Sequence, residues 1–259
     1  MGRFNSSRTR VAPVFDALLA RDPTGQTWLP RLVLLGSRSP SIAGIGEVGF
    51  LPADHPAWWG RSERALRPPL ALLRWLVRHA SEPASAKAWG ADTTRRRRKL
   101  LVRRDPKTVQ QALELLDGKI PRRAWYVLEG ESRPDACLQT DRMLLVVEGK
   151  RTEPKATTTT TWMKRRSQLV RHMDSAWEGR GNRRVFGLLV VEAQHVDRVP
   201  PDWTRETDAE FSKANLVSSL PHRTPQERDD IAAGFLGTTT WQMVCRKLSL
   251  PWPPGVDTL

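Results

Sequence analysis

The spacing of the hydrophobic residues changes along the chain and separates predicted helices from predicted strands. From Ala65 to His79 the apolar residues recur at intervals of three and four, which predicts a helix. The same spacing from Asp105 to Leu116 predicts a second helix, with Asp105 as N-cap, Pro106 in the first turn and Gly118 after its end. A third helix is expected from Trp162 to Trp177.

Between the second and third helices the spacing approaches two, which is typical of strands. Three strands are predicted, over residues 124–130, 135–139 and 143–150, separated by short polar segments. A fourth, nearly continuous apolar run over residues 183–193 predicts a central strand covered on both faces. The order from residue 105 onward is helix, three-stranded meander, helix, strand, which predicts an α/β fold.

The segments on either side of this core are less regular. The sequence "RLVLLG" (residues 31–36) predicts a short strand, and helices are expected near residues 208–218 and 226–236. We therefore expect an N-terminal extension of loops, a helix and a basic run over residues 1–104, a core over residues 105–197, and a C-terminal helical extension over residues 198–259.

Charge points to a polyanionic partner. The chain of 259 residues has a formal net charge of +14 and a pI near 10.9, with a normal hydrophobic fraction of 39%, so it should fold and also attract phosphate groups. Residues 1–197 hold 35 Lys or Arg against 20 Asp or Glu, whereas residues 198–259 hold 7 against 8. The densest basic run, Arg95 to Arg104, has seven cations and is a candidate for phosphate contact.

Several classes of protein are disfavoured. Cys137 and Cys245 are the only cysteines, so neither a disulfide framework nor a pair of thiolates at zinc-ligand spacing is present. No apolar run approaches the ~20 residues of a membrane helix, and the first ten residues lack the apolar stretch of a secretory signal. We expect a soluble, cytoplasmic protein that does not bind membranes.

One predicted strand ends in charged residues. Glu148 and Lys150 are two residues apart, so their side chains emerge on the same face of the strand. If Asp141 and Arg142 form a two-residue turn, paired positions sum to 283 and Asp135 lies opposite Glu148. Two carboxylates and an ammonium group then meet at one edge of the sheet.

Such a group of side chains suits a divalent cation. Two carboxylates that face each other are costly without a positive charge between them, and Mg²⁺, for which Mn²⁺ can substitute, takes one or two carboxylates together with water and substrate phosphate. A lysine beside that ion can hydrogen-bond the attacking water and align it with a phosphorus atom. The alternative is a surface ion pair between Asp135 and Lys150, with Glu148 paired to Arg142 or Arg151.

This pattern resembles the PD-(D/E)XK nuclease superfamily, which has the restriction-endonuclease-like fold. The motif consists of Pro134-Asp135, twelve intervening residues, and Glu148-Gly149-Lys150, and the element order of the family core matches residues 105–192, about a third of the chain. The resemblance implies that Asp135 and Glu148 are metal ligands and that Lys150 is the catalytic lysine. It also implies the peptide carbonyl of Gly149 as a further ligand.

The resemblance suggests additional site residues. An acid from the first core helix often joins the metal ligands of such enzymes, and Glu114 is the candidate, with Glu129 as a competitor. Gln168 and His172 are four residues apart and share a helix stripe with Arg165. They resemble the Gln-x-x-x-Tyr motif of RecB-type nuclease domains, with His172 in the tyrosine position, and Gln168 is counted with the catalytic residues. The expected nucleic-acid contacts are Arg95, Arg96, Arg97, Arg98, Lys99, Arg151 and Arg165.

These observations predict a Mg²⁺-dependent phosphodiesterase that acts on DNA, either as an endonuclease or as an exonuclease. A homodimer would suit an enzyme that cuts both strands of a duplex. One alternative is a protein of the same fold that binds nucleic acid without cutting it, and another is a structural protein whose basic face meets an acidic protein. Trp58 and Trp59, in a Pro-rich segment, are candidates for stacking on unpaired bases.

Overall fold

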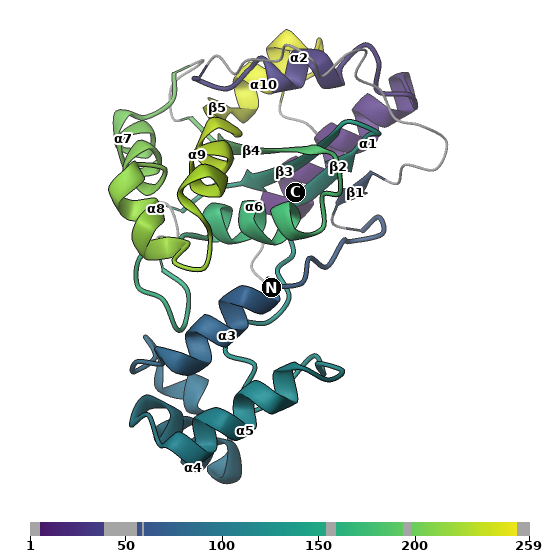
Figure 1. The fold of residues 1–259 in the computed structure, drawn as a ribbon. Coiled ribbons are helices and arrows are strands. Elements are labelled where there is room, and N and C mark those ends of the chain that lie inside the picture. The colour runs from purple at the N-terminus through teal and green to yellow at the C-terminus, as the bar shows by residue number, and fades with distance from the viewer. Residues whose placement is uncertain (1–5, 39–55, 59, 154–158, 194–197, 253–259) are drawn as a thin grey trace.

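The chain folds around one mixed sheet of five strands, in the order β1-β2-β3-β4-β5 (Figure 1). The computed structural model describes residues 6–38, 56–58, 60–153, 159–193 and 198–252. The strands are β1 (Ala57–Trp58), β2 (Ala136–Gln139), β3 (Met143–Gly149), β4 (Arg184–Val191) and β5 (Phe235–Thr240). Strand β2 is antiparallel to both of its neighbours, β1 and β3, whereas β4 and β5 run parallel to β3. The predicted α/β class is confirmed at this level.

Two of the predicted elements in and beside the sheet are wrong. Residues 124–130 form turns, because Trp125, Tyr126 and Leu128 are buried in a separate helical cluster, and β1 occupies the position expected for the first strand of the meander. Residues 235–240, expected as the end of a helix and the chain beyond it, form β5, and all six of its residues are buried. The short run "FLGTTT" shows no clear period, so its strand character depends on pairing with β4.

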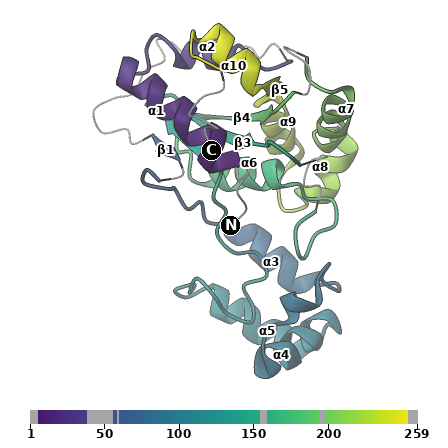
Figure 2. The same ribbon diagram turned by 180° about the vertical axis from the view of Figure 1, so that it is seen from behind.

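One face of the sheet is covered by the N-terminal and C-terminal helices, as Figure 2 shows. These are the five-residue π-helical segment η1 (Ser7–Val11) and the helices α1 (Ala12–Arg21), α2 (Leu29–Val33) and α10 (Trp241–Lys247). Their apolar residues pack on alternate positions of the strands, including Leu138, Leu145 and Val147. The expected strand in "RLVLLG" is wrong, because Leu32 and Val33 complete a short helix whose buried side chains join this layer.

Four helices cover the opposite face (Figure 1). They are α6 (Gln168–Glu178), α7 (Pro201–Glu210), α8 (Lys213–Ser219) and α9 (Pro225–Ala233). Leu144 and Val146, which alternate with Leu145 and Val147 on β3, point into this second core. The sheet is therefore buried on both faces, as the continuous apolar run of β4 predicted.

A second group of helices lies beyond the sheet, at the bottom of Figure 1, and is called here the helical body (residues 67–131). It comprises α3 (Leu70–Arg78), the 3₁₀ turn η2 (Ala86–Trp89), α4 (Asp92–Val102) and α5 (Pro106–Leu116). The helical body has its own core, in which Leu72, Leu76 and Leu101 are fully buried. The predicted helix after Asp105 is confirmed, and the Asp105 carboxylate accepts a hydrogen bond from the Thr108 amide at 2.9 Å.

None of the helices in the described part of the chain combines the length and the apolar character needed to cross a membrane. The two cysteines, Cys137 and Cys245, are both buried as free thiols.

Candidate active site

The β2–β3 hairpin has the register predicted from the two-residue turn. Ala136 pairs with Val147 and Gln139 pairs with Leu144, so the paired positions sum to 283. The Thr140 amide donates to the Met143 carbonyl at 2.9 Å and closes the turn. Continuing this register by one residue brings Asp135 opposite Glu148, at the end of the hairpin where β3 approaches its carboxyl end.

Glu148 and Lys150 form a buried ion pair at this edge. Lys150 Nζ lies 2.7 Å from Glu148 Oε1, and the two residues are 8% and 2% exposed. Burial favours neutral forms, but the ion pair outweighs it, so the pKa of Lys150 is raised. Burial also acts to raise the pKa of Glu148, yet hydrogen bonds and charges from His172 and Lys150 lower it overall. Both groups are held in their charged forms.

Helix α6 supplies two side chains to this pair. The Ser167 hydroxyl accepts from the Val170 amide and caps the helix, so Gln168 and His172 lie one turn apart on the same face. Lys150 Nζ donates to Gln168 Oε1 at 3.3 Å, and His172 Nε2 lies 3.1 Å from Glu148 Oε2. The predicted stripe is therefore confirmed for Gln168 and His172, but Arg165 precedes the helix and does not share it.

Asp135 is held from the other side of the sheet. Its Oδ2 accepts from the Gly149 amide at 2.8 Å, and its Oδ1 accepts from the hydroxyl of Ser7 in η1. Burial and the nearby Glu148 carboxylate raise the pKa of Asp135 to about 7, although both hydrogen bonds act to lower it. A second carboxylate beside Glu148 is thus destabilised in its charged form unless a cation is close.

Gly149 is a position where no side chain fits. A Cβ atom built there would lie 2.8 Å from Trp241 Cζ2 and 2.9 Å from Val11 Cγ2. Trp241 is itself fixed, because its Nε1 donates to the Lys150 carbonyl at 3.2 Å. The motif Glu-Gly-Lys therefore has a packing reason for its glycine, in addition to the metal ligation that the resemblance implies for the Gly149 carbonyl.

Glu114, expected as a metal ligand from the first core helix, does not reach this site. It is exposed on α5 in the helical body, where its Oε1 accepts from Gln110 Nε2 at 2.8 Å. Figure 1 shows α5 at the end of the molecule remote from β3. The expectation was wrong because α5 does not cover the sheet beside Asp135. The segment η1 lies there instead, ahead of α1, and it supplies Ser7 and Arg10.

Glu129, the competing acid, belongs to a buried ionic network. Arg166, which is fully buried, donates to both oxygens of Glu129 and to Asp174 Oδ2 at 2.8 Å. Asp174 also accepts from Arg223 at 2.7 Å. The network ties α6 to the chain that enters β2 and to the loop before α9. Glu129 therefore has a structural role next to the site.

The predicted basic contacts fall into two groups. Arg95, Arg96, Arg97 and Lys99 are exposed on α4, as is Arg165 ahead of α6. Arg98 faces inward instead, where its guanidinium donates to the carbonyls of Ala88, Ala124 and Trp125. Arg151 is also turned inward, with a side chain 9% exposed and Nε 3.3 Å from Glu192 Oε2. Arg98 and Arg151 are therefore structural cations in this conformation.

The stacking proposal for the two tryptophans is wrong at the position that the structure describes. Trp58 is buried in the core, where it stacks on Phe15 at a centroid distance of 5.5 Å and donates to Asp16 at 2.9 Å. Trp59 lies outside the described residues.

Sequence reasoning missed the contribution of the N-terminal segment. Ser7 contacts Asp135 across 128 positions of sequence, and Arg10 donates to both oxygens of Glu192, at 2.7 and 3.0 Å, next to the end of β4. "SSRTR" shows no apolar period, so nothing local predicts a helical segment against the sheet. The only signal was the apolar run that follows it in α1.

The carboxylates at the site fit a hard cation with few protein ligands. Within the described residues, no three His, Cys, Asp or Glu side chains gather closely enough to hold a metal ion. Asp135, held from the side of η1, and Glu148, held from the side of α6, remain as the candidate ligands. Each engaged carboxylate oxygen keeps a second lone pair for a ligand. Two carboxylates with water and phosphate oxygens are a donor set typical of Mg²⁺, whereas zinc would require more nitrogen or sulfur ligands.

Comparisons with protein-family models, with curated proteins and with solved structures found no match to this chain.

Proposed function

We propose that this protein is a Mg²⁺-dependent nuclease that hydrolyses phosphodiester bonds in DNA. The observation that carries the proposal is that Glu148 and Lys150 form a buried ion pair at the end of β3, while Asp135, next to the start of β2, accepts from the amide of Gly149 between them. A protein that only binds a polyanion gains nothing from two buried carboxylates facing its ligand. Two such acids contribute to binding when a cation lies between them and a phosphate.

Lys150, Gln168 and His172 each have a different role in the proposed hydrolysis. Lys150, held charged by Glu148, is placed to hydrogen-bond the attacking water and to stabilise negative charge on the phosphate. Gln168 accepts from Lys150 and restricts its ammonium group to this edge of the sheet. His172 orients Glu148 from the opposite oxygen.

Asp135, Glu148 and the Gly149 carbonyl would hold the Mg²⁺ ion. When bound, the ion would lower the pKa of water and neutralise charge on the phosphate. Ser7 and the Gly149 amide fix the orientation of the Asp135 carboxylate.

The order of elements supports a restriction-endonuclease-like core with a different composition from that expected. Helix α1 covers the sheet, β1, β2 and β3 form the antiparallel meander, and α6 leads to β4, which is parallel to β3. This is helix, three strands, helix, strand, with α1 and β1 in place of α5 and residues 124–130. The helical body is then an insertion between the first two strands of the core.

The distribution of charge favours nucleic acid as substrate. The helical body holds 15 Lys or Arg against 7 Asp or Glu, so a quarter of the chain supplies +8 of the net charge of +14. Its helix α4 exposes Arg95, Arg96 and Lys99 to solvent. Such a surface gains affinity by releasing counterions from a phosphate backbone.

The test of the proposal is cleavage of end-labelled DNA and RNA oligonucleotides, single-stranded and duplex, by wild type and Asp135→Asn. We expect wild type to cut DNA with Mg²⁺ or Mn²⁺ and not with EDTA, and Asp135→Asn to bind without cutting. The specific observation that favours a non-catalytic binder is the absence of a three-ligand metal cluster among the described residues. Binding without metal-dependent cleavage in any condition would establish that alternative.

A further inference from the structure

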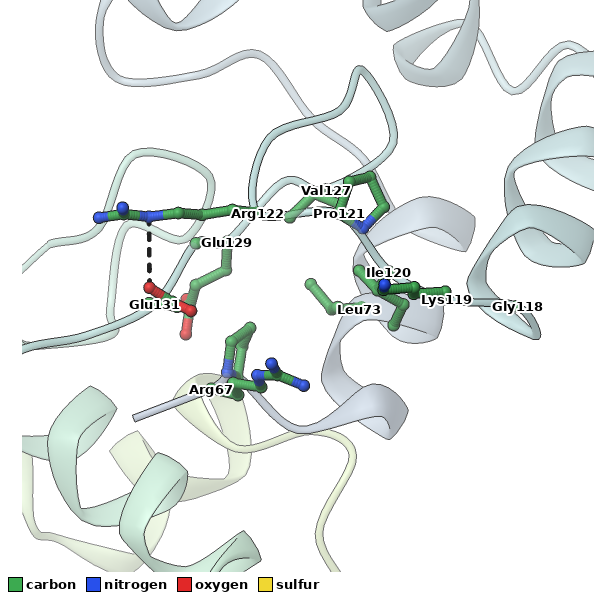
Figure 3. Close-up of a pocket in the computed structure, with 12 residues that line it drawn as sticks. Arg67, Leu73, Gly118, Lys119, Ile120, Pro121, Arg122, Val127, Glu129 and Glu131 are labelled. Carbon is green, nitrogen blue, oxygen red and sulfur yellow. Dashed lines mark ion pairs between the residues drawn. The ribbon is translucent and has the colours of Figure 1, made fainter. Parts of the chain in front are cut away.

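A cavity of about 360 Å³ opens in the helical body, where the chain leaves it toward β2 (Figure 3). It is lined by the start of α3, the loop 118–122 and the segment 127–131. Its volume falls within the range of roughly 300 to 1,000 Å³ that small-molecule sites occupy. The cavity is separate from the carboxylates of the candidate active site.

The lining of this cavity combines aliphatic and charged side chains. Leu73, Ile120 and Val127 provide aliphatic surface suited to one planar ring. Arg67 and Lys119 lie at the rim, and neither forms an ion pair with an acid of the described residues. An apolar surface beside unpaired cations complements a nucleobase that carries a phosphate.

The acids that line the cavity are already neutralised. Glu131 lies 3.3 Å from Arg122, the contact drawn in Figure 3. Glu129 is paired with Arg166 at 2.9 Å. The positive charges of Arg67 and Lys119 are therefore not cancelled by these two carboxylates, and an anionic group can bind at the rim.

The cavity is connected to the candidate active site by short covalent and hydrogen-bonded links. Glu131 precedes Asp135 by four residues, which span at most about 14 Å, the axial length of about four stacked nucleotides. Arg171 Nη2 donates to the carbonyls of Gly130 and Glu131 at 2.7 and 3.0 Å, and the next residue is His172. A strand whose phosphate lies at Lys150 can therefore bring a nearby nucleotide to the cavity.

We infer that the cavity binds one unpaired nucleotide of the substrate strand, with the base on the aliphatic surface and its phosphate between Arg67 and Lys119. The inference rests on the proposed function and narrows the substrate to single-stranded DNA or to a frayed or unpaired end. A base can enter such a cavity only when it leaves the stack, and that step costs least in a strand that is already unpaired.

The experiment adds a side chain to the wall of the cavity without a clash. Gly130 lines the cavity and a Cβ atom there meets no atom within 4 Å, so the test variant is Gly130→Leu, and Gly179→Leu, equally open at the end of α6, is the matched control. A second test replaces the rim cations, Arg67→Gln with Lys119→Gln, and compares them with Lys107→Gln on exposed α5. All variants carry Lys150→Met, and binding of a labelled single strand and of a blunt duplex is measured by fluorescence anisotropy.

We expect Gly130→Leu and the rim variant to weaken single-strand binding by about tenfold, with duplex binding changed less than twofold. Equal affinities for Gly130→Leu and Gly179→Leu would overturn the inference, as would equal losses for the strand and the duplex. Cleavage by the same variants with Lys150 restored separates the two proposals. If the variants cleave normally and their binding is unaltered, the cavity proposal is wrong and the nuclease proposal stands. If single-strand binding is selectively lost in a protein that never cuts, the cavity proposal stands and the nuclease proposal is wrong.

Discussion

His172 Nε2 lies 3.1 Å from Glu148 Oε2, on the opposite oxygen from the one that Lys150 contacts. His172 is 1% exposed, and its Nδ1 has no hydrogen-bond partner among the described residues. A hydrogen bond to a carboxylate requires the proton on Nε2, so the ring donates to Glu148. The buried carboxylate of Glu148 is thus held through one oxygen by α6 and through the other by Lys150, which follows its own strand.

Removing this hydrogen-bond donor should weaken metal binding and cleavage without abolishing them. We expect His172→Phe, which keeps the ring volume, to lower cleavage and Mn²⁺ affinity by about 10- to 100-fold, as outer partners of metal ligands commonly do. Titration calorimetry with Mn²⁺ measures the affinity independently of activity. His79→Phe, at an exposed ring stacked on Trp75, is the matched control. Equal Mn²⁺ affinity in His172→Phe and wild type would refute a positioning role.

Ser7 should act on Asp135 in the same way from the other face. Ser7→Ala removes the hydroxyl that Asp135 Oδ1 accepts from and leaves the Gly149 amide in place. We expect Mn²⁺ affinity to fall by about tenfold, with the folded protein otherwise intact. The control is Ser6→Ala, one residue earlier, whose side chain makes no capping hydrogen bond. A Ser7→Ala protein that binds Mn²⁺ more tightly than wild type would show instead that the hydroxyl competes with the ion.

The cations of α4 should separate into structural and binding residues. Arg98→Ala should destabilise the protein by about 2 kcal/mol, because three backbone carbonyls lose a charged donor. Arg96→Ala and Lys99→Ala should leave stability unchanged and each reduce the slope of log affinity against log salt by about 1. Urea unfolding and DNA binding at four salt concentrations measure the two effects. A salt slope that is unchanged in both exposed variants would exclude α4 from the DNA interface.

Glu210 should make stability depend on pH. Burial, opposed by a hydrogen bond from Ser167 and aided by the charge of Glu206, raises the pKa of Glu210 to about 7 from an ordinary 4.5. The folded protein therefore holds this proton more tightly than the unfolded chain, so stability from Glu210 is greatest below pH 4.5 and falls as the pH rises through 7. The fall is on the order of 3 kcal/mol at most. The free energy of unfolding is measured with urea between pH 4.5 and 8 for wild type and for Glu210→Gln. The difference between the two proteins should show this loss as the pH rises, and a difference that does not change with pH would contradict it.

The hairpin was predictable because its rules are local. A two-residue turn fixes the register, so the pairing of β2 with β3 was predicted correctly without knowledge of the rest of the chain. Glu148 and Lys150 also lie side by side, as their spacing predicted. The one-turn spacing of Gln168 and His172 is equally local, and the structure brings both to the site.

Long-range pairing was not predictable in this way. β1 lies 78 positions before its partner residue in β2, with the helical body between them, so no spacing in the sequence relates the two strands. The regular helix after Asp105 looked like the first helix of the core because it precedes the hairpin, whereas the helix on the sheet is α1, near the N-terminus. That error of topology also misplaced Glu114.

The most direct test of the central claim is cleavage of circular plasmid, linear duplex and circular single-stranded DNA by wild type, Lys150→Met and Lys247→Met. Lys247 is exposed on α10 and controls for loss of one cation. We predict metal-dependent cleavage by wild type and Lys247→Met, and a loss of at least about a hundredfold in Lys150→Met with DNA binding retained. Cleavage by Lys150→Met at the wild-type rate, or no cleavage by any of the three proteins with Mg²⁺ or Mn²⁺, would contradict the proposal that these residues form a nuclease site.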